Sequence, residues 1–257
     1  MSLISVADFW SKAENAASWT SPEIGNPVTP QGTINYSPCK FNNGSYNTGP
    51  AIAVNYLYGS NIISNLNSFI YEEWIKTDFS VNSGVADNGK QNGRFGIFQD
   101  NNNILYSTFH NSGTWGLYTL VKTQGVQYNI AMKSAAITFA AGSLNHIFTV
   151  FNPNGIAGGS DTLRVYLNGS LVGSSAISFN AFPNNNNIFY FNCIRGTSNI
   201  AYPSNMLIDN VKIYNSTSQE TIDQIIANRN NEGWPVDGYP NASRFNNIRG
   251  IASGGSL

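Results

Sequence analysis

The sequence is poor in charge and in long apolar runs, and each shortage excludes a class of protein. Only 11% of the 257 residues are charged and the formal net charge is −1, so the chain lacks the basic surface of a nucleic-acid or polybasic membrane binder. No apolar stretch reaches the roughly 18 residues of a membrane span, and we expect no membrane insertion. The N-terminus lacks a basic segment followed by an apolar one, so we expect no signal peptide in this chain.

Cysteine is also scarce. Cys39 and Cys193 are the two cysteines, and most of the chain lies between them. A disulfide between them would join an early strand to a late one. Two buried free thiols fit the sequence equally well, because pairing requires Cα atoms within about 7 Å. Zinc-type spacing is absent.

What the chain has in quantity is glycine and neutral polar residues. It contains 24 glycines and 41% hydrophobic residues, which indicates a globular fold whose polarity comes from amides and hydroxyls. Such a neutral surface is typical of proteins that work outside a reducing cytosol. We therefore expect an extracellular, cell-surface or virion location, with a leader removed or with export by another route.

Alternating apolar residues, the signature of β-strands, fill most of the chain. The strongest signal is Leu163–Gly173 (LRVYLNGSLVG), where Asn168-Gly169 separates two short runs and predicts a tight hairpin. The longest expected strand is Asn67–Phe79. Further strands are expected at Arg94–Gln99, Ile104–His110, Trp115–Val121, Val126–Phe139, Leu144–Phe151, Ile188–Ile194 and Met206–Tyr214.

Two segments have helical patterns. Ser218–Asn230 has an apolar isoleucine stripe, with Thr217 and Glu220 as a capping box. Ser5–Trp19 is predicted to be a short helix capped by Ser5. Many strands with a short amphipathic helix near the end predict an all-β fold, a two-sheet antiparallel jelly-roll sandwich with one short C-terminal helix. We expect a single domain over residues 1–257, with its core at about 33–231 and extensions at both ends.

Four blocks in order carry a resemblance to a known family: SFIYEEWIKTDF, LNHIFTVFNPNG, LRVYLNGSLVG and MLIDNVKIYNSTSQETI. They resemble the consecutive "FTISAWVKT", "WHHVAVTYDG", "RLYVNGELVG" and "GLIDEVRIYNRALSAEEI" blocks of laminin-G-like domains in the concanavalin A-like lectin/glucanase superfamily. CKFNNGSY is similar to the opening strand of that family. The resemblance implies a pentraxin-like jelly roll that binds glycans or proteins, frequently with bound calcium.

Calcium (Ca2+) is therefore the one cofactor to consider, in a structural role. Asp209 alternates with apolar residues, so its carboxylate falls on an apolar face and needs backbone amides, a cation or the domain edge. In sandwiches similar to this one an acid at this place can be a calcium ligand. Asp161, in the GGSD turn, and Asp100 are alternative acids that also suit turn formation.

Catalytic patterns are missing. Glucanases of the superfamily use E-x-D-x-x-E on one strand, which places carboxylates on one face, and this motif does not occur here. Glu72 and Glu73 are adjacent, so they should point to opposite faces. Of the two histidines, His146 lies where the family has a packing histidine. We predict that the protein is not an enzyme.

A binding surface is the stronger prediction. Glu72 and Trp74 share one face of their strand, as Arg164 and Tyr166 do of theirs, and together they would offer aromatic platforms beside charged groups that suit a sugar. The alternative is that the helix or the N-terminal segment covers this face. Trp115, between glycines in HNSGTWGLY, is a second candidate ligand contact, or a loop anchor.

Three functions therefore compete. The first is a non-catalytic carbohydrate-binding or adhesion module on a secreted or virion surface, whose partner is a glycan or surface glycoprotein. The second is a structural or decoration protein of a virion or cell coat, which self-assembles into a homo-oligomer without a small ligand. The third is a glycan-cleaving enzyme, which two carboxylates about 5–10 Å apart in a groove would support.

Overall fold

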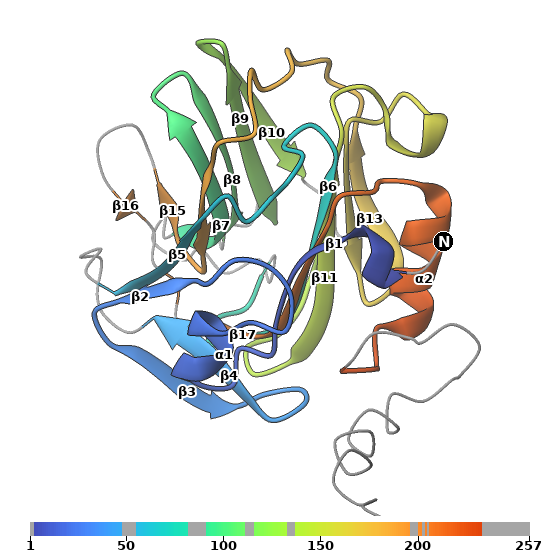
Figure 1. Ribbon diagram of the computed structural model, residues 1–257. Helices are drawn as coiled ribbons and strands as arrows, with labels where there is room; N and C mark the ends of the chain where they lie inside the picture. The colour runs from blue at the N-terminus through green and yellow to red at the C-terminus, as the bar shows by residue number, and fades with distance from the viewer. Residues whose placement is uncertain are drawn as a thin grey trace, which may run out of the picture.

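A computed structural model of the chain describes residues 3–47, 55–81, 91–110, 116–132, 137–195, 200–201, 204 and 206–232. In these residues two antiparallel sheets, here named sheet A and sheet B, stack face to face, with a small two-stranded sheet beside them (Figure 1). This is the two-sheet sandwich that the alternating pattern predicts. None of the helices in this part of the chain has the length and apolar character needed to span a bilayer.

Sheet A contains both the first and the last strand of the described chain, because β1 pairs with β17. Its strands in spatial order, with β1 added beside β17, are β13 (Ser170–Ser175), β12 (Leu163–Leu167), β11 (Leu144–Phe151), β6 (Phe69–Lys76), β17 (Leu207–Tyr214), β4 (Asn43–Asn47), β3 (Ile34–Pro38) and β1 (Ala7–Ser11).

Sheet B is the second layer, and the small sheet of β15 (Ile194–Arg195) and β16 (Ile200–Ala201) lies beside it. The strands of sheet B in spatial order are β10 (Val126–Met132), β9 (Leu117–Thr123), β8 (Asn103–His110), β7 (Gln91–Asp100), β14 (Ile188–Phe191), β5 (Tyr56–Ser60) and β2 (Thr29–Gln31).

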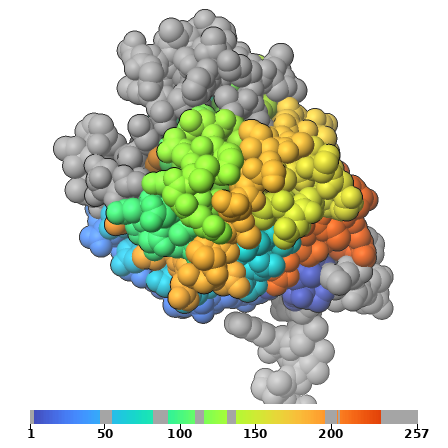
Figure 2. All heavy atoms as spheres, turned by 90° about the horizontal axis from the view of Figure 1, so that it is seen from above, coloured from blue at the N-terminus to red at the C-terminus, as the bar shows by residue number. Residues whose placement is uncertain are grey.

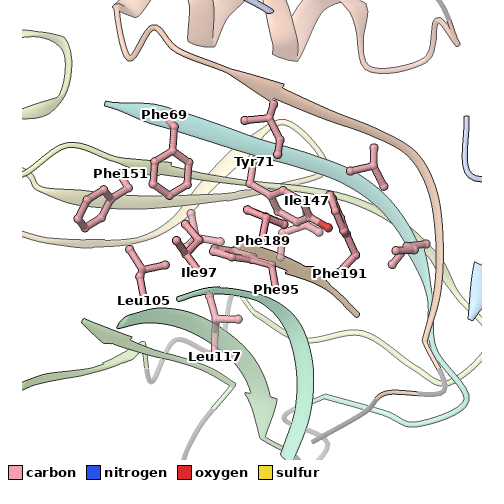
Figure 3. Close-up of a cluster of buried hydrophobic side chains, with 14 of the residues drawn as sticks. Phe69, Tyr71, Phe95, Ile97, Leu105, Leu117, Ile147, Phe151, Phe189 and Phe191 are labelled. Atoms are coloured by element: carbon pink, nitrogen blue, oxygen red, sulfur yellow. The ribbon is translucent and has the colours of Figure 1, made fainter. Parts of the chain in front are cut away.

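Aromatic rings fill the space between the sheets (Figure 3). Tyr71 of β6 lies 4.7 Å from Phe95 of β7 and 5.4 Å from Phe189 of β14, measured between ring centroids. These rings are buried, and each fully buried aromatic or aliphatic side chain contributes about 1.5–3 kcal/mol. Contacts of this kind between the layers hold sheet A on sheet B.

Residues 176–187 close the sandwich between the edge strands β10 and β13. Phe179 stacks on Phe151 at 5.5 Å and meets Tyr128 edge-on at the same distance. Gln124 donates to the Ala181 carbonyl at 3.2 Å. Figure 2 shows this gold-coloured segment on the surface beside the green strands of sheet B. The segment thus seals the core without forming a strand.

The N-terminal helix predicted over Ser5–Trp19 is wrong. The chain instead forms the 3-10 turn η1 (Leu3–Val6), then β1, then the short helix α1 (Ala16–Thr20), which Asn15 caps. Phe9 is fully buried in the sandwich core. Pairing of β1 with β17 places that ring in the core, and this long-range gain outweighs local helical propensity.

The C-terminal helix is confirmed with a different cap. Helix α2 (Gln219–Asn228) begins after Ser218, whose side chain accepts a hydrogen bond from the Thr221 N–H. Thr217, the predicted cap, instead accepts from the Asn152 amide at 2.9 Å. The hairpin prediction is confirmed as well: Asn168 and Gly169 both have positive φ, 52° and 88°, as a type I′ turn requires.

Strand boundaries differ from the predictions where a residue departs from extended backbone. The predicted strand Ile188–Ile194 divides into β14 and β15 at Asn192, which has a φ of 56°. The Asn192 N–H donates to the Arg94 carbonyl at 2.8 Å, which fixes the bend. The predicted strand Val126–Phe139 ends earlier, because β10 stops at Met132.

The two cysteines are free thiols. Cys193 is buried and Cys39 is partly buried. Burial and, to a smaller extent, the nearby Asp209 carboxylate raise the pKa of the Cys39 thiol to about 12. Neither thiol is therefore suited to act as a nucleophile near neutral pH.

Candidate functional site

The outer face of sheet A, where the sequence analysis looked for a ligand surface, is covered. Helix α2 and the turn η1 lie against it (Figure 1). They complete a second apolar cluster made of Leu3, Val6, Ile70, Phe148, Val150, Ile156, Tyr166, Tyr214, Ile222 and Ile225. The alternative left open by the sequence, that the helix or the N-terminal segment covers this face, is therefore what the structure shows.

Beneath that cover Glu72 is the centre of a buried polar network. One of its oxygens lies 2.9 Å from His146 Nε2, and the other accepts a hydrogen bond from the Tyr214 hydroxyl. Burial acts to raise the pKa of Glu72, but the charge of Lys212 and the two hydrogen bonds outweigh it, so the pKa is lowered. The carboxylate is thus held ionised and is not available to a ligand from solvent.

Trp74 and Tyr166 are buried as well. The Trp74 indole donates to the Arg229 carbonyl at 2.9 Å, and the Lys40 ammonium lies 4.3 Å from the ring centroid. Tyr166 stacks on Phe148 at 4.4 Å. Arg164, which is mostly buried, pairs with Asp161 at 2.8 Å. These residues pack under or beside α2 and do not form an open platform.

Glu73 points the other way, into the space between the sheets, as adjacent positions on a strand require. It accepts from Arg94 Nε at 2.9 Å and from the Tyr71 hydroxyl at 2.7 Å. Burial raises the pKa of Glu73, although Arg94 opposes the rise. The prediction that Glu72 and Glu73 face opposite sides, and so cannot act as a catalytic pair, is confirmed.

Asp209 lies on the same covered side as Trp74. One of its carboxylate oxygens accepts from the backbone N–H groups of Lys40 and Phe41, both at 2.9 Å. Burial raises the pKa of Asp209 to about 6, which the charges of Glu232 and Glu14 reinforce. One carboxylate oxygen of Asp209 is thus held by two backbone N–H donors.

The predicted calcium site is not supported by the groups around these acids. Asp161 already pairs with Arg164. Within the described ranges no group of three or more His, Cys, Asp or Glu side chains is arranged to hold a metal ion. Bound calcium therefore stays a prediction for direct measurement.

The outer face of sheet B is different, because tyrosines line it. Tyr58 of β5 is paired with Tyr190 of β14, which is paired with Gly96 of β7. The same row continues to Tyr106 of β8 and Leu120 of β9. Directly paired residues share one face of a sheet, so these side chains lie in one line across five strands.

Three tyrosines at one end of that row form a cluster, here named the tyrosine patch: Tyr56, Tyr58 and Tyr190. Their ring centroids lie 5.6–6.3 Å apart. Tyr190 is buried, whereas Tyr56 and Tyr58 keep part of their surface exposed. Burial raises the pKa of Tyr190, and a hydrogen bond and the charge of Arg195 oppose that rise. The Tyr190 hydroxyl therefore stays protonated near neutral pH.

Across the row a second aromatic pair lies on β8 and β9. Tyr106 and Tyr118 are partly exposed, with ring centroids 6.1 Å apart. The Tyr118 hydroxyl donates to Asn129 Oδ1 at 2.7 Å, and Gln127 donates to the same oxygen at 3.0 Å. Trp115, the other predicted ligand contact, lies outside the described residues.

The sequence analysis missed the tyrosine patch although a signal was present. In NYLYGS, Tyr56 and Tyr58 lie on either side of Leu57, which is fully buried in the core. Period-two alternation therefore predicts that both tyrosines point away from the core. Trp74 and Tyr166 show the same alternating pattern. The two pairs of residues differ in that α2 covers Trp74 and Tyr166 but not Tyr56 and Tyr58.

Comparisons with known proteins agree with this fold. Domain 4 of AbnA, a GH43 extracellular arabinanase from Geobacillus stearothermophilus solved with arabinotriose, is 16% identical with a TM-score of 0.61, covering 86% of this chain and 97% of that one. The binding domain of Paraclostridial Mosquitocidal Protein 1 is 13% identical with a TM-score of 0.64, covering 87% of this chain and 52% of that one.

A structure of botulinum neurotoxin type C, whose cell entry depends on interaction with two ganglioside molecules, is also similar. It is 15% identical with a TM-score of 0.58, covering 89% of this chain and 52% of that one. The chain thus spans about half the length of these toxin chains. No curated protein matches the sequence.

The family is shown by the sequence itself. The Laminin_G_3 family model, described as the concanavalin A-like lectin/glucanases superfamily, matches residues 55–222. This range is more than half of the 257 residues and includes the strands of both sheets that carry the tyrosine patch and the Glu72 network. The chain belongs to the concanavalin A-like lectin/glucanases superfamily.

Proposed function

We propose that the protein is a non-catalytic carbohydrate-binding module and that the outer face of sheet B is its contact surface. The observation that carries the proposal is the row of tyrosines with partly exposed rings, Tyr56, Tyr58, Tyr106 and Tyr118, beside amide side chains. An aromatic ring stacks against the apolar C–H face of a sugar, and neighbouring hydroxyls and amides bond its OH groups.

The setting and partner belong to the same proposal. The protein would act outside the cell or on a cell or virion surface, where it attaches to a glycan or a surface glycoprotein. The neutral, amide-rich composition supports this setting. The similarity to a domain of an extracellular arabinanase, solved with arabinotriose, supports a sugar ligand.

A cleaving activity is less well supported. The Glu72 and Glu73 carboxylates lie on opposite faces and are both buried. On the outer face of sheet B, the described acid is Asp100 at the end of β7, and it accepts bonds from Asn102 and Asn103. A pair of carboxylates flanking one glycosidic bond is therefore not found on this face in the part of the chain that the structure describes.

A glycan array followed by calorimetric titration tests the proposal. Tyr58→Ala should weaken binding of the best glycan about tenfold, the loss expected for one aromatic stacking partner. Tyr46→Ala is the matched control, because Tyr46 is also partly exposed but lies on β4 of sheet A. No glycan signal, or equal weakening by both substitutions, would contradict the proposal.

The remaining predictions use the same titration. Trp115→Ala tests the predicted loop contact, and a loss of affinity without a loss of stability would support it. Repeating the array with EDTA tests calcium. Because Asp209 already accepts two backbone hydrogen bonds, we expect chelation to change affinity less than twofold. A larger loss that added Ca2+ restores would instead support a bound ion.

A further inference from the structure

Arg195 lies at the middle of the outer face of sheet B, where Gly96 makes room for it. A Cβ atom at Gly96 would lie 3.1 Å from the backbone nitrogen of Arg195 and 3.1 Å from the Cα of Ile194. That spacing is tighter than ordinary contact, so the glycine lets β15 pass directly over β7. The row of tyrosines is thus crossed by a strand that carries an arginine.

The surroundings of the Arg195 guanidinium are aromatic. Its central carbon lies 4.4 Å from the ring centroid of Phe98. Burial raises the pKa of both Tyr190 and Tyr56, and the charge of Arg195 opposes that rise in each. The guanidinium therefore packs against the ring of Phe98 on the face of sheet B that carries the tyrosine patch.

This cation has no acidic partner in the described ranges. The ion pairs found there are Lys12–Glu23, Arg94–Glu73, His146–Glu72 and Arg164–Asp161. In addition, Arg195 Nε is buried and makes no hydrogen bond. The Arg195 side chain as a whole is partly exposed, so its terminal nitrogens, and not Nε, are the donors considered for a ligand.

We propose that Arg195 makes the site selective for acidic glycans, by binding the carboxylate of a sugar whose ring stacks on the tyrosine patch. The inference rests on the proposed function and names its ligand class. The planar guanidinium presents parallel N–H donors that match both carboxylate oxygens. The patch supplies the stacking surface, and the unmatched positive charge supplies the selectivity.

Two matched probe pairs test this with the 257-residue chain: 3′-sialyllactose against lactose, and trigalacturonic acid against its carboxyl-reduced form. The native protein should bind the acidic member of at least one pair about tenfold more tightly, as one charge-assisted contact predicts. Arg195→Gln should abolish that preference and leave the affinity for the neutral member within twofold. Arg195→Lys, which keeps the positive charge but not the parallel N–H donors of the guanidinium, should retain part of the preference for the acidic member.

Two controls separate this inference from the proposed function. Tyr58→Ala should weaken both members of a pair, whereas Arg195→Gln weakens only the acidic one. Lys122→Gln removes one positive charge from the same sheet, where Lys122 Nζ bonds the Asn101 carbonyl, and should leave the acidic preference intact. Circular dichroism and melting curves check that each variant is folded.

The outcomes are distinct. Neutral sugars that bind as tightly as acidic ones, or an acidic preference that survives Arg195→Gln, would overturn the role of Arg195 and leave the glycan site standing. An equal loss with Lys122→Gln would also overturn it, because the effect would then come from the general field of the face. Failure of every probe and array glycan to bind would overturn both proposals.

Discussion

The two outer faces of the sandwich start from the same sequence pattern and end in different roles. Both carry aromatic and polar side chains at alternate positions of long strands. On sheet A, Trp74 and Tyr166 are buried under α2 and η1. On sheet B, Tyr56 and Tyr58 remain partly exposed. The difference teaches that the element lying over a sheet decides whether outward-facing residues become a second core or stay partly exposed to solvent.

Charged side chains also have different surroundings on the two outer faces. On sheet A, Glu72, His146 and Lys212 are all buried; Glu72 lies 2.9 Å from His146 Nε2, and the charge of Lys212 lowers the pKa of Glu72 against the effect of burial. On sheet B, Arg195 faces tyrosines without an acidic partner in the described ranges. The buried charges of sheet A stabilise the fold by pairing with one another, whereas the role proposed for Arg195 is to bind a ligand. The predictions below test that contrast.

The largest effect on stability should come from breaking the network on sheet A. Glu72→Ala leaves Lys212 buried without its main counter-charge, and removes the acceptor for His146 and Tyr214. We expect the free energy of unfolding to fall by about 3–5 kcal/mol, measured by urea denaturation. Glu23→Ala, which removes an exposed surface pair, should cost less than about 1 kcal/mol. Similar losses of unfolding free energy in Glu72→Ala and Glu23→Ala would show that the buried network adds no more stability than an exposed ion pair.

The next effect should come from loosening the cover itself. Ile225 of α2 is 1% exposed and belongs to the cluster above sheet A. Ile225→Ala should lower the free energy of unfolding by about 2–5 kcal/mol. Ile226→Ala is the matched control, because the Ile226 side chain, next to Ile225 in sequence, is only partly buried. This substitution should lower the free energy of unfolding by about 1 kcal/mol.

Glycan binding on sheet B should not change in Ile225→Ala under conditions where the variant is folded. Loss of affinity in proportion to the loss of stability would mean that the binding surface includes the covered face, and the two faces could not then be assigned separate roles.

A smaller effect should appear as a pH dependence at Asp209. Because its folded pKa of about 6 lies above the ordinary value of 3.8, the folded chain binds this proton more tightly than the unfolded chain does. Stability at this site therefore decreases as pH rises from about 4 to about 6, by up to about 3 kcal/mol. In Asp209→Asn that dependence is removed.

Urea denaturation of both proteins from pH 4 to pH 7 measures it. The difference in unfolding free energy, native minus variant, should decrease through that range and then stay constant. A difference that is flat, or that increases with pH, would show that the pKa of Asp209 in the folded chain is not raised above its ordinary value.

Most of the fold could be predicted from the sequence because alternation and turn chemistry are local. Leu144–Phe151 was predicted with the observed bounds, and Asn168-Gly169 formed the expected turn. The N-terminal segment could not be predicted in the same way. Phe9 enters the core only because β1 reaches β17, a partner about two hundred residues away.

The candidate site was harder to predict than the fold. Period-two spacing predicts that Trp74 faces away from the sandwich interior. The structure agrees, because Trp74 pairs with Asp209 and the two share the covered outer face of sheet A. Whether that face is exposed to solvent depends on where α2 packs, and local sequence patterns do not predict the position of α2. The role of Gly96 was likewise hidden, because it depends on the close passage of β15.

Amide hydrogen exchange with and without the best-binding glycan tests the central claim most directly, because it observes both faces in one experiment. We predict that slowed exchange on binding is confined to peptides of β5, β7, β8, β9, β14 and β15, with η1, α2 and β12 unchanged. Slowed exchange on η1, α2 and β12 with sheet B unchanged would contradict the account and return the binding surface to sheet A.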